Sequence, residues 1–478
     1  MRSRRILGSG GEGGEAPMPS LELTWIKARA TLRFNLTGQH TGQQIWGEAP
    51  MTRRRFWVYF LLFLLNAICY IDRVNMSLAG HSVAQEYGLS PVALGYLFSS
   101  FLWAYVLMML PAGRLVDSLG MHRMAAIAAA VWSIFQALTG AAAGFVTILL
   151  TRLGLGAGEA PTYPVTYQAV RDWGPYTERG WAVGAISAGS MLGPALAAPG
   201  VAWLIQATSW RWSFALTGGI GLLWVVLWSV FVRTPERTRW VPEPERQRIL
   251  AERYAGEPPS EGKGVGYLGL MRSPSMWGLA ISQGCAVYSL YLYLSWLPTY
   301  LVTARHLSIA SSGLFTAVPF AAASVIMIAT NWIGDRLLTP GTMRSGRRRL
   351  VVVASLVLTA GGMLIPLAHS LALVVFLTIL PVSFASTTPA TNAALTNDLL
   401  RSSADSGRAF GFLVLGGNVF GLFAPIVTGY IVAATGSFNS AFVLAGALAL
   451  FGAVVSAAFT HHTLGETIPE RAVAARAP

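Results

Sequence analysis

Four ionisable residues interrupt stretches of sequence that are otherwise apolar. Asp72 and Arg73 are adjacent in one stretch, and Arg152 and Glu159 lie seven positions apart in another. On a helix that spacing is close to two turns, so Arg152 and Glu159 project from nearly the same face, about 10 Å apart along the axis. Two acids and two bases that meet in an apolar interior can neutralise one another, so we expect one ionic cluster.

Such a cluster can link the binding of an anion to the binding of a proton. Burial and a neighbouring guanidinium act in opposite directions on a carboxylate's affinity for a proton, so a small change in hydration can load or release one. The planar fork of an arginine suits a carboxylate, so an anionic ligand could compete with Asp72 or Glu159 for Arg73 or Arg152. The alternative is a buried ion cluster that only joins helices. Buried ion pairs are weak stabilisers, which favours a functional role.

Three glycines lie between the two charged residues of the second stretch. Gly154, Gly156 and Gly158 occupy alternate positions, and small residues let a neighbouring membrane helix approach closely. We expect that neighbour to be the helix that carries Asp72 and Arg73.

Long apolar runs must position these residues. The 478-residue chain is 54% hydrophobic and only 12% charged, whereas about a quarter of the residues in soluble proteins carry charge. A membrane-spanning helix needs about 20 mainly apolar residues, and twelve such runs can be drawn. They are Phe56–Leu78, Pro91–Leu110, Met124–Ala142, Ile148–Val170, Trp181–Ile205, Ser213–Val232, Met276–Leu301, Ser311–Trp332, Leu350–Leu367, Leu371–Leu395, Phe410–Ile431 and Ala441–Phe459. The sequence predicts an all-α polytopic membrane protein with twelve transmembrane helices.

The basic residues alternate between the two sides of this arrangement. Nineteen Lys and Arg residues fall in the connections after the even-numbered runs, whereas only Arg211 and Arg305 fall in those after the odd-numbered runs. By the positive-inside rule, both termini and the long middle connection face the cytoplasm of a bacterium, and the protein spans its inner membrane. The net charge of +13 is explained in this way without a nucleic-acid partner.

The runs divide six plus six around a polar connection. We expect a disordered N-terminal extension over 1–55, in which Met51 is a candidate for the true start, and six-helix bundles over 56–232 and 274–461. Residues 233–273 form a cytoplasmic linker and residues 462–478 a cytoplasmic tail. Repeated bundles are typical of transporters that bind substrate at the midplane between halves that rock against each other.

A short motif recurs after the second run of each half. The first copy contains Gly113, Asp117 and Arg123, and the second contains Asp335 and Arg336. This Gly-x-x-x-Asp loop resembles the signature of the major facilitator superfamily, whose acidic and basic residues latch the cytoplasmic ends of helices. The resemblance implies the twelve-helix fold of that superfamily and a gating latch at these five positions. The first copy lacks two of the usual basic residues, which implies a weaker latch.

Three longer strings resemble one family within that superfamily, the anion:cation symporters. They are Tyr70–Ser77, Arg152–Pro161 and Ser295–Leu301, and they occur in the same order along the chain. Bacterial galactonate, hexuronate and glucarate carriers belong to this family.

The family resemblance assigns roles to the ionic cluster. It implies that Asp72 and Glu159 couple transport to protons and that Arg73 recognises the carboxylate of the substrate. We further expect Arg152 to be the resting partner of Asp72 and to contribute to substrate binding.

The second half has no charged residue in the interior of its runs, so it must supply uncharged contacts. The candidate substrate-binding residues are Gln283, Tyr288, Tyr291, Ser386, Thr387, Asn392 and Asn418. The Gln and the last Asn resemble positions that meet sugar hydroxyls in galactonate-type carriers. Each could instead form an interhelical hydrogen bond, because such side chains often join membrane helices.

Aromatic and proline residues suggest the surroundings of the site. Tyr163 lies between two prolines, and we expect it to line the cavity where the fourth run is distorted. Trp296 and Tyr300 are predicted anchors at the periplasmic interface. Pro194 and Pro199 suit a flexible gating helix, although close packing explains them equally well.

These observations predict a proton-coupled symporter that imports a small organic anion, most simply an aldonate or hexuronate, by alternating access. The alternative is a uniporter, antiporter or exporter of aromatic or dicarboxylic organic acids, and a membrane sensor that retains the fold is a further reading. The sequence contains no metal-ligand cluster, nucleophile triad or nucleotide-binding loop, so we do not expect an enzyme. We expect the proton to be the coupling ion, no cofactor, and a monomer in the lipid bilayer.

Overall fold

The computed structural model describes residues 54–464, apart from 176–177, 239, 255–263, 340–341, 343–345, 401 and 403–404. Met51, most of the N-terminal extension and the tail beyond residue 464 lie outside the described residues. In the part that is described, every long element is a helix, and an isolated β-bridge joins Leu400 to Leu464. The predicted all-α class is confirmed.

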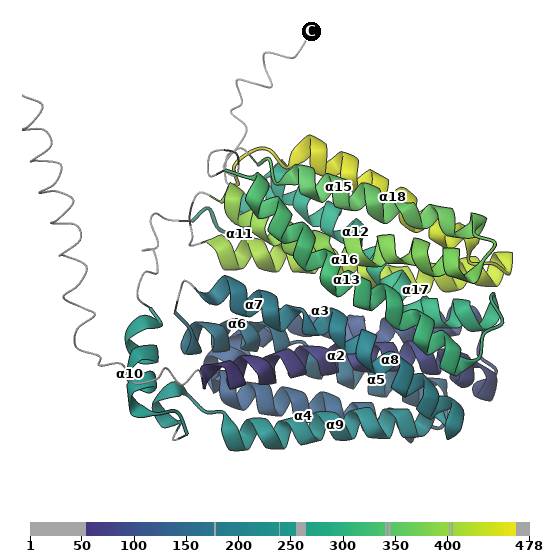
Figure 1. Cartoon of the computed structure of the whole chain (residues 1–478), viewed down its shortest axis with the longest axis horizontal. Coiled ribbons are helices and arrows are strands. Elements are labelled where there is room, and N and C mark those ends of the chain that lie inside the picture. Colours follow the sequence, from purple (N-terminus) through teal and green to yellow (C-terminus); the bar gives the residue numbers. More distant parts are fainter. Residues whose placement is uncertain are drawn as a thin grey trace, which may run out of the picture. The chain divides into compact units, whose positions relative to one another are not determined.

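The first bundle contains the first six spans (Figure 1). Its single-helix spans are α2 (Arg55–Tyr87), α3 (Pro91–Leu119), α4 (Met121–Gly140) and α9 (Trp210–Phe231). The fourth span consists of α5 (Phe145–Glu159) and α6 (Thr162–Trp173), and the fifth of α7 (Arg179–Ser187) and α8 (Gly189–Ala207).

The linker and the second bundle follow. The linker contains η2 (Pro235–Arg237), α10 (Glu243–Glu252) and α11 (Gly266–Met271). The second bundle contains α12 (Pro274–Thr303), α13 (Ile309–Leu337), α15 (Arg349–Thr359) continued by η3 (Ala360–Leu367), α16 (Leu371–Leu399), α17 (Ser406–Thr435) and α18 (Asn439–Phe459).

Eleven helical spans in the described ranges are long and apolar enough to cross a membrane. The remaining predicted span, Ile148–Val170, is not one helix, because it is interrupted after Glu159. Pro161 has no backbone N–H to donate, and its ring hinders a continuous helix, which accounts for the interruption. The twelve-span arrangement therefore holds, with the fourth span in two pieces.

The glycines of α5 allow close approach to α3 and α4. A Cβ on Gly158 would lie 2.7 Å from the backbone nitrogen of Trp132 on α4, and Gly156 faces the backbone of Phe101 on α3. The expectation that these glycines face α2 is wrong. The helix α2 reaches α5 through a long arginine side chain rather than through backbone contact.

The halves contact each other mainly where α3 packs on α17, α8 on α13 and α2 on α12. We call the end of the spans beside α10 the linker end, and the opposite end, where α2 ends and α3 begins, the distal end. Glycines bring the halves together near the distal end. A Cβ on Gly95 would lie 2.6 Å from Pro425 O, and one on Gly313 would lie 2.7 Å from Ala198 O.

The linker is fastened to both halves. The backbone N–H of Arg55 at the start of α2 donates to Glu245 of α10 at 3.2 Å. At the other end, the N–H of Val265 donates to Asp405, directly before α17, at 2.6 Å. Burial of the Asp405 carboxyl tends to raise its pKa. Hydrogen bonds from Arg408 and from the backbone outweigh burial and hold the pKa of Asp405 below its ordinary value.

Candidate functional site

The ionic cluster is built around an ion pair between α2 and α5. Arg73 lies on α2, and Glu159 is the last residue of α5, directly before the break in the fourth span. Arg73 Nη2 lies 2.6 Å from Glu159 Oε2, and Arg73 Nε donates to the same oxygen at 3.2 Å. Glu159 Oε1 is buried and has no hydrogen-bond partner among the described residues. That oxygen is available to accept a hydrogen bond.

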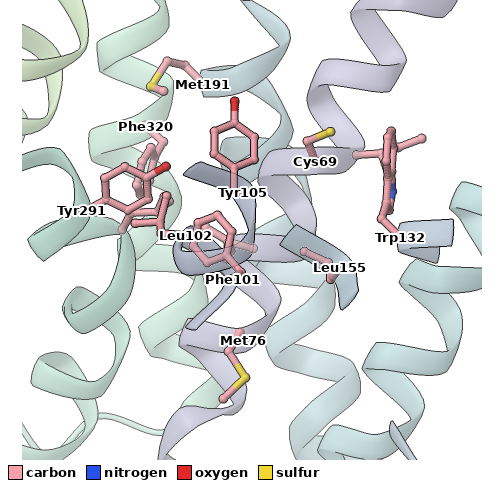
Figure 2. Packing of buried hydrophobic residues seen from close by; sticks show 14 of the residues in the cluster. Cys69, Met76, Phe101, Leu102, Tyr105, Trp132, Leu155, Met191, Tyr291 and Phe320 are labelled. Atoms are coloured by element: carbon pink, nitrogen blue, oxygen red, sulfur yellow. The ribbon is translucent and has the colours of Figure 1, made fainter. Parts of the chain in front are cut away.

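Arg73 also reaches the second half. Its Nη1 donates to the hydroxyl of Tyr291 on α12 at 3.0 Å. The guanidinium carbon lies 4.6 Å from the ring centroid of Tyr70 and 4.9 Å from that of Phe101. Figure 2 shows Tyr291 and Phe101 in the same part of the core as Tyr105, which also faces the guanidinium. Arg73 thus contacts both halves, and aromatic rings surround its guanidinium.

Asp72 and Arg152 are buried near this pair but do not bind each other. Neither carboxylate oxygen of Asp72 has a hydrogen-bond partner within the described part of the chain. Arg152 Nη1 instead donates to Gln136 Oε1 at 3.5 Å, and its guanidinium carbon lies 5.3 Å from the ring centroid of Phe101. The expected ion pair of Asp72 with Arg152 is not formed in this conformation, in which Arg152 instead contacts Gln136 and Phe101.

A buried polar network continues from Arg152 towards the distal end. Gln136 on α4 and Asn75 on α2 each donate a side-chain N–H to Thr217 Oγ1 on α9 at 3.0 Å. Ser213, one turn before Thr217, donates to Asn75 Oδ1 at 2.7 Å. These residues were not predicted as site residues from the sequence. The available signal was a set of polar side chains in apolar runs, above all Asn75, which lies one turn from the Asp-Arg pair.

A small cavity lies beside the two arginines. It is lined by Arg73, Met76, Phe98, Phe101, Arg152, Tyr291, Leu294 and Ser295, and its volume of about 10 Å³ is close to what a single water occupies. The residues come from both halves. A cavity of this size has no room for an organic ligand beside the two arginines.

Three of the predicted contacts in the second half carry buried polar atoms without a partner in the described ranges. These atoms are Gln283 Oε1 and the hydroxyl of Tyr288 on α12, and Asn392 Oδ1 on α16. The amide nitrogen of Asn392 donates to Ser282 at 3.2 Å, which leaves its oxygen available. Unpartnered buried polar atoms cost free energy, so these three suit a bound ligand better than a closed core.

The other predicted contacts are arranged differently. The amide of Asn418 donates to Val414 O within its own helix at 2.9 Å. Ser386 and Thr387 also donate to carbonyls one turn earlier in α16. Tyr163 is partly buried on α6, directly after the break in the fourth span.

The two predicted latches differ. In the second half, Arg348 lies 2.5 Å from Asp335 and 2.7 Å from Asp398, and it joins the ends of α13 and α16. Burial tends to lower the pKa of Arg348, but these hydrogen bonds outweigh burial and raise the pKa above its ordinary value. Arg336, which we expected to act with Asp335, instead lies over the ring of Trp332 at 4.1 Å.

The first copy of the motif forms no such clamp. Asp117 and Arg123 are exposed, and Gly113 has open space around its Cα. Neither Asp117 nor Arg123 forms an ion pair with another described residue, in keeping with the weaker latch expected there.

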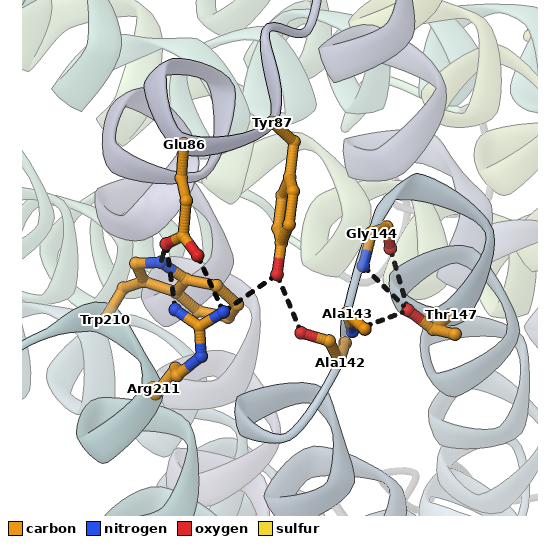
Figure 3. Close-up of polar contacts among 8 residues, drawn as sticks. All are labelled: Glu86, Tyr87, Ala142, Ala143, Gly144, Thr147, Trp210 and Arg211. Carbon is orange, nitrogen blue, oxygen red and sulfur yellow. Dashed lines mark hydrogen bonds and ion pairs between the residues drawn. The ribbon is translucent and has the colours of Figure 1, made fainter.

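The charges at the distal end hold the first bundle together. Arg211 forms two hydrogen bonds with Glu86, at 2.7 and 2.8 Å, and one with the hydroxyl of Tyr87 at 2.9 Å. Figure 3 shows that Tyr87 donates in turn to Ala142 O. These contacts connect α2, α9 and the segment between α4 and α5. One of the two basic residues that depart from the positive-inside pattern is thus fixed by an acid.

Trp296 and Tyr300 are not anchors at the membrane interface. They are 2% and 4% exposed, and the indole N–H of Trp296 donates to Pro425 O at 3.1 Å. Anchors of that kind face the lipid headgroups, whereas these rings pack inside the protein.

Comparison with known proteins adds to the geometry. The sequence model of the Major Facilitator Superfamily matches residues 62–343 and 337–475. The D-galactonate transporter of Escherichia coli O6:H1 is 29% identical over 412 residues, which cover 84% of this chain and 94% of the relative. The hexuronate transporter of Bacillus subtilis is 32% identical over 418 residues, which cover 86% and 95%.

A solved structure shows the same fold. The xylose transporter XylE from E. coli, in an inward open conformation, superposes with a TM-score of 0.66 over 88% of this chain and 99% of that one. The two sequences are 15% identical, so this likeness concerns the fold alone.

Proposed function

Because this chain belongs to the Major Facilitator Superfamily, a family of membrane transporters rather than enzymes, we propose that it imports a sugar acid together with protons by alternating access. The linker end would face the cytoplasm of a bacterium and the distal end the periplasm. One observation carries the proposal. The buried guanidinium of Arg73 contacts Glu159 of its own half and Tyr291 of the second half.

This contact gives a physical route to coupling. A substrate carboxylate that binds Arg73 takes the place of Glu159 Oε2 on the guanidinium fork. Glu159 is then left as an unpaired charge in an apolar interior, which is costly, and a proton removes that cost. Anion binding and proton binding therefore favour each other.

Asp72 contributes a second protonation site. Its oxygens are buried without a hydrogen-bond partner among the described residues, a setting in which the uncharged acid is the cheaper form. When the site opens and Arg152 leaves Gln136, Asp72 can release its proton and pair with that guanidinium. The same four side chains then alternate between two sets of partners.

The substrate class follows from the rest of the site. Two relatives that match over most of the chain transport D-galactonate and hexuronate. The unpartnered oxygens of Gln283, Tyr288 and Asn392 suit hydroxyl groups, and a sugar acid offers a carboxylate at one end and hydroxyls along its chain. Asn418 and Tyr163 would contact the substrate only after a rearrangement.

Purified protein in proteoliposomes tests the proposal. Uptake of radiolabelled D-galactonate, D-glucuronate and D-glucarate is measured with the lumen alkaline, with no gradient, and with the gradient reversed. We expect at least one acid to accumulate only with an alkaline lumen. If uptake does not depend on the pH gradient, the protein is a uniporter or exchanger and not a proton symporter. If none of the three acids is taken up, the proposed substrate class is refuted.

A further inference from the structure

A larger cavity lies between the halves at the distal end. Its volume is about 300 Å³, and the ends of α2, α3, α12, α17 and α18 border it. Residues that line it include His81, Trp296, Thr299, Tyr300, Phe438 and Asn439. Pockets of about 300 Å³ and more hold small organic ligands.

Trp296 separates this cavity from the small one beside Arg73. Its ring meets that of Phe98 edge-on, with centroids 5.1 Å apart, and Phe98 lines the inner cavity. Pro298 lies two residues further along α12 and cannot donate a hydrogen bond to the carbonyl of Leu294, so the helix is weakened at this level. An anion that enters from the distal end meets the larger cavity first and passes Trp296 to reach Arg73.

Thr299 lines this cavity and carries a hydroxyl without a hydrogen-bond partner in the described ranges. The residue is 6% exposed, and its Oγ1 is buried. The carbonyl of Ser295, one turn earlier, already accepts from the Ser77 hydroxyl at 2.6 Å. Thr303, one turn later, differs because its hydroxyl donates to Thr299 O at 2.8 Å. A buried hydroxyl without a partner costs free energy, which a ligand oxygen can recover.

The charges around the cavity favour an anion. No Asp or Glu is found among the described residues that line it. Two helices, α3 and α18, begin at its wall and three, α2, α12 and α17, end there, so the helix dipoles favour neither sign of charge. The imidazole of His81 is a hydrogen-bond donor in either protonation state. Arg305 adds a fixed positive charge next to the wall, where it donates to the Tyr300 hydroxyl at 2.9 Å.

We propose that this cavity is an entry site that binds the carboxylate of the transported organic acid before Trp296 and Phe98 separate. The Thr299 hydroxyl and the His81 imidazole hold the acid there, over the rings of Trp296 and Phe438. The proposal rests on the proposed function for the direction of travel and for the class of ligand.

Equilibrium binding separates the entry site from the inner site. Isothermal titration calorimetry follows D-galactonate, D-glucuronate and D-glucarate with the full chain in nanodiscs. Arg73→Gln disables the inner site, so we expect it to leave one weaker binding event. Adding Thr299→Val should weaken that event about fivefold or more, because about 1 kcal/mol or more is lost with the hydroxyl. Thr303→Val is the matched control, because its hydroxyl is already used within α12.

The outcomes distinguish the two proposals. If Arg73→Gln abolishes all binding, or if Thr299→Val and Thr303→Val behave alike, the entry site is refuted and the proposed function stands. If the unmodified protein binds none of the three acids, the proposed substrate class is refuted, and a second measurement decides on the entry site.

That second measurement needs no substrate. Ala304 borders the cavity and Ala143 is exposed at the distal end away from it, while both native cysteines are buried. Cysteines introduced by Ala304→Cys and Ala143→Cys are reacted with anionic sulfonatoethyl and cationic trimethylammonioethyl methanethiosulfonate. For each cysteine we compare the reaction rate of the anionic reagent with that of the cationic reagent. We expect this ratio of rates to be at least about fivefold higher at position 304 than at position 143. Adding His81→Gln should lower the ratio at position 304. Equal ratios at both positions would refute an anion site.

Discussion

The two halves of the molecule place opposite chemistry around one site. At the level of the site, the first half buries Asp72, Arg73, Arg152 and Glu159. The buried charged residues in the described part of the second half are Arg348 and Asp405, and both lie at the linker end. The second half faces the site with uncharged amides and hydroxyls instead.

In the proposed mechanism this difference divides two tasks between the halves. Recognition of a carboxylate and exchange of a proton would share one set of side chains in the first half, so the two events would affect each other directly. The rest of the substrate would be left to the second half, where a changed amide or hydroxyl would alter the choice of substrate without altering the coupling.

The largest effect is expected at Arg73, which belongs to the ionic half but contacts both. Arg73→Gln leaves Glu159 without its partner, and breaking a buried ion pair costs about 3–5 kcal/mol. Initial uptake in proteoliposomes should fall by more than about 100-fold, and Arg73→Lys should restore only part of it because the fork is lost. Arg171→Gln, an exposed arginine on α6, is the control. Full uptake by Arg73→Gln would refute the division.

Tyr291 and Tyr288 lie on the same helix of the second half, but only Tyr291 bonds to the ionic cluster. A hydrogen bond to a charged group contributes about 1.5–3 kcal/mol, so Tyr291→Phe should lower the maximal transport rate about tenfold or more. Tyr288→Phe should leave thermal stability unchanged, because its hydroxyl has no protein partner in the described ranges, and should raise KM for a hydroxylated acid. If both variants changed only KM, Tyr291 would have no part in coupling.

Gln136 tests whether the ionic half depends on its neutral network. Gln136→Leu removes the acceptor of Arg152 and a donor to Thr217, at a cost of about 1–2 kcal/mol. We expect transport about 5- to 30-fold slower and a shifted pH profile, since the arginine beside Asp72 is no longer held. Ser100→Ala, whose hydroxyl serves only its own helix, should change neither. A slower rate with an unchanged pH profile would show that Gln136 is only structural.

The smallest effect is expected at the latches. Here the second half, rather than the first, carries the ion pairs. Arg348→Gln removes two ion pairs, one of them to the largely exposed Asp335, so a loss of about 1–2 kcal/mol in thermal stability is expected. Asp117→Asn in the first half should change stability by less than about 0.5 kcal/mol. Equal effects would mean that both latches are closed in solution.

Much of the fold followed from composition and periodicity. The apolar runs located all twelve spans, because a span needs a fixed length of apolar sequence. The break in the fourth span was predicted only as a distortion near Tyr163. The signal for its two separate helices was Pro161, which lacks a backbone N–H and lies directly before α6.

The sequence predicted which residues form the site better than it predicted the contacts between them. The four charged residues were found because charge is rare inside a membrane. Their pairing was not, since Arg73 and Arg152 are both long enough to reach either acid, and the choice depends on Gln136 and Phe101 from other helices. The burial of Trp296 was missed because an aromatic residue near the end of a span is typical of an interface anchor.

In the proposed mechanism, Glu159 exchanges its arginine for a proton when substrate binds. Glu159→Gln imitates the protonated acid, so exchange and accumulation of the transported acid by this variant, measured in the same proteoliposomes, show whether that proton is needed. We predict that counterflow exchange stays within about threefold of the unmodified protein, because Gln can still accept from Arg73, while accumulation driven by an alkaline lumen disappears. Accumulation by Glu159→Gln that equals that of the unmodified protein at every imposed pH gradient would contradict the claim.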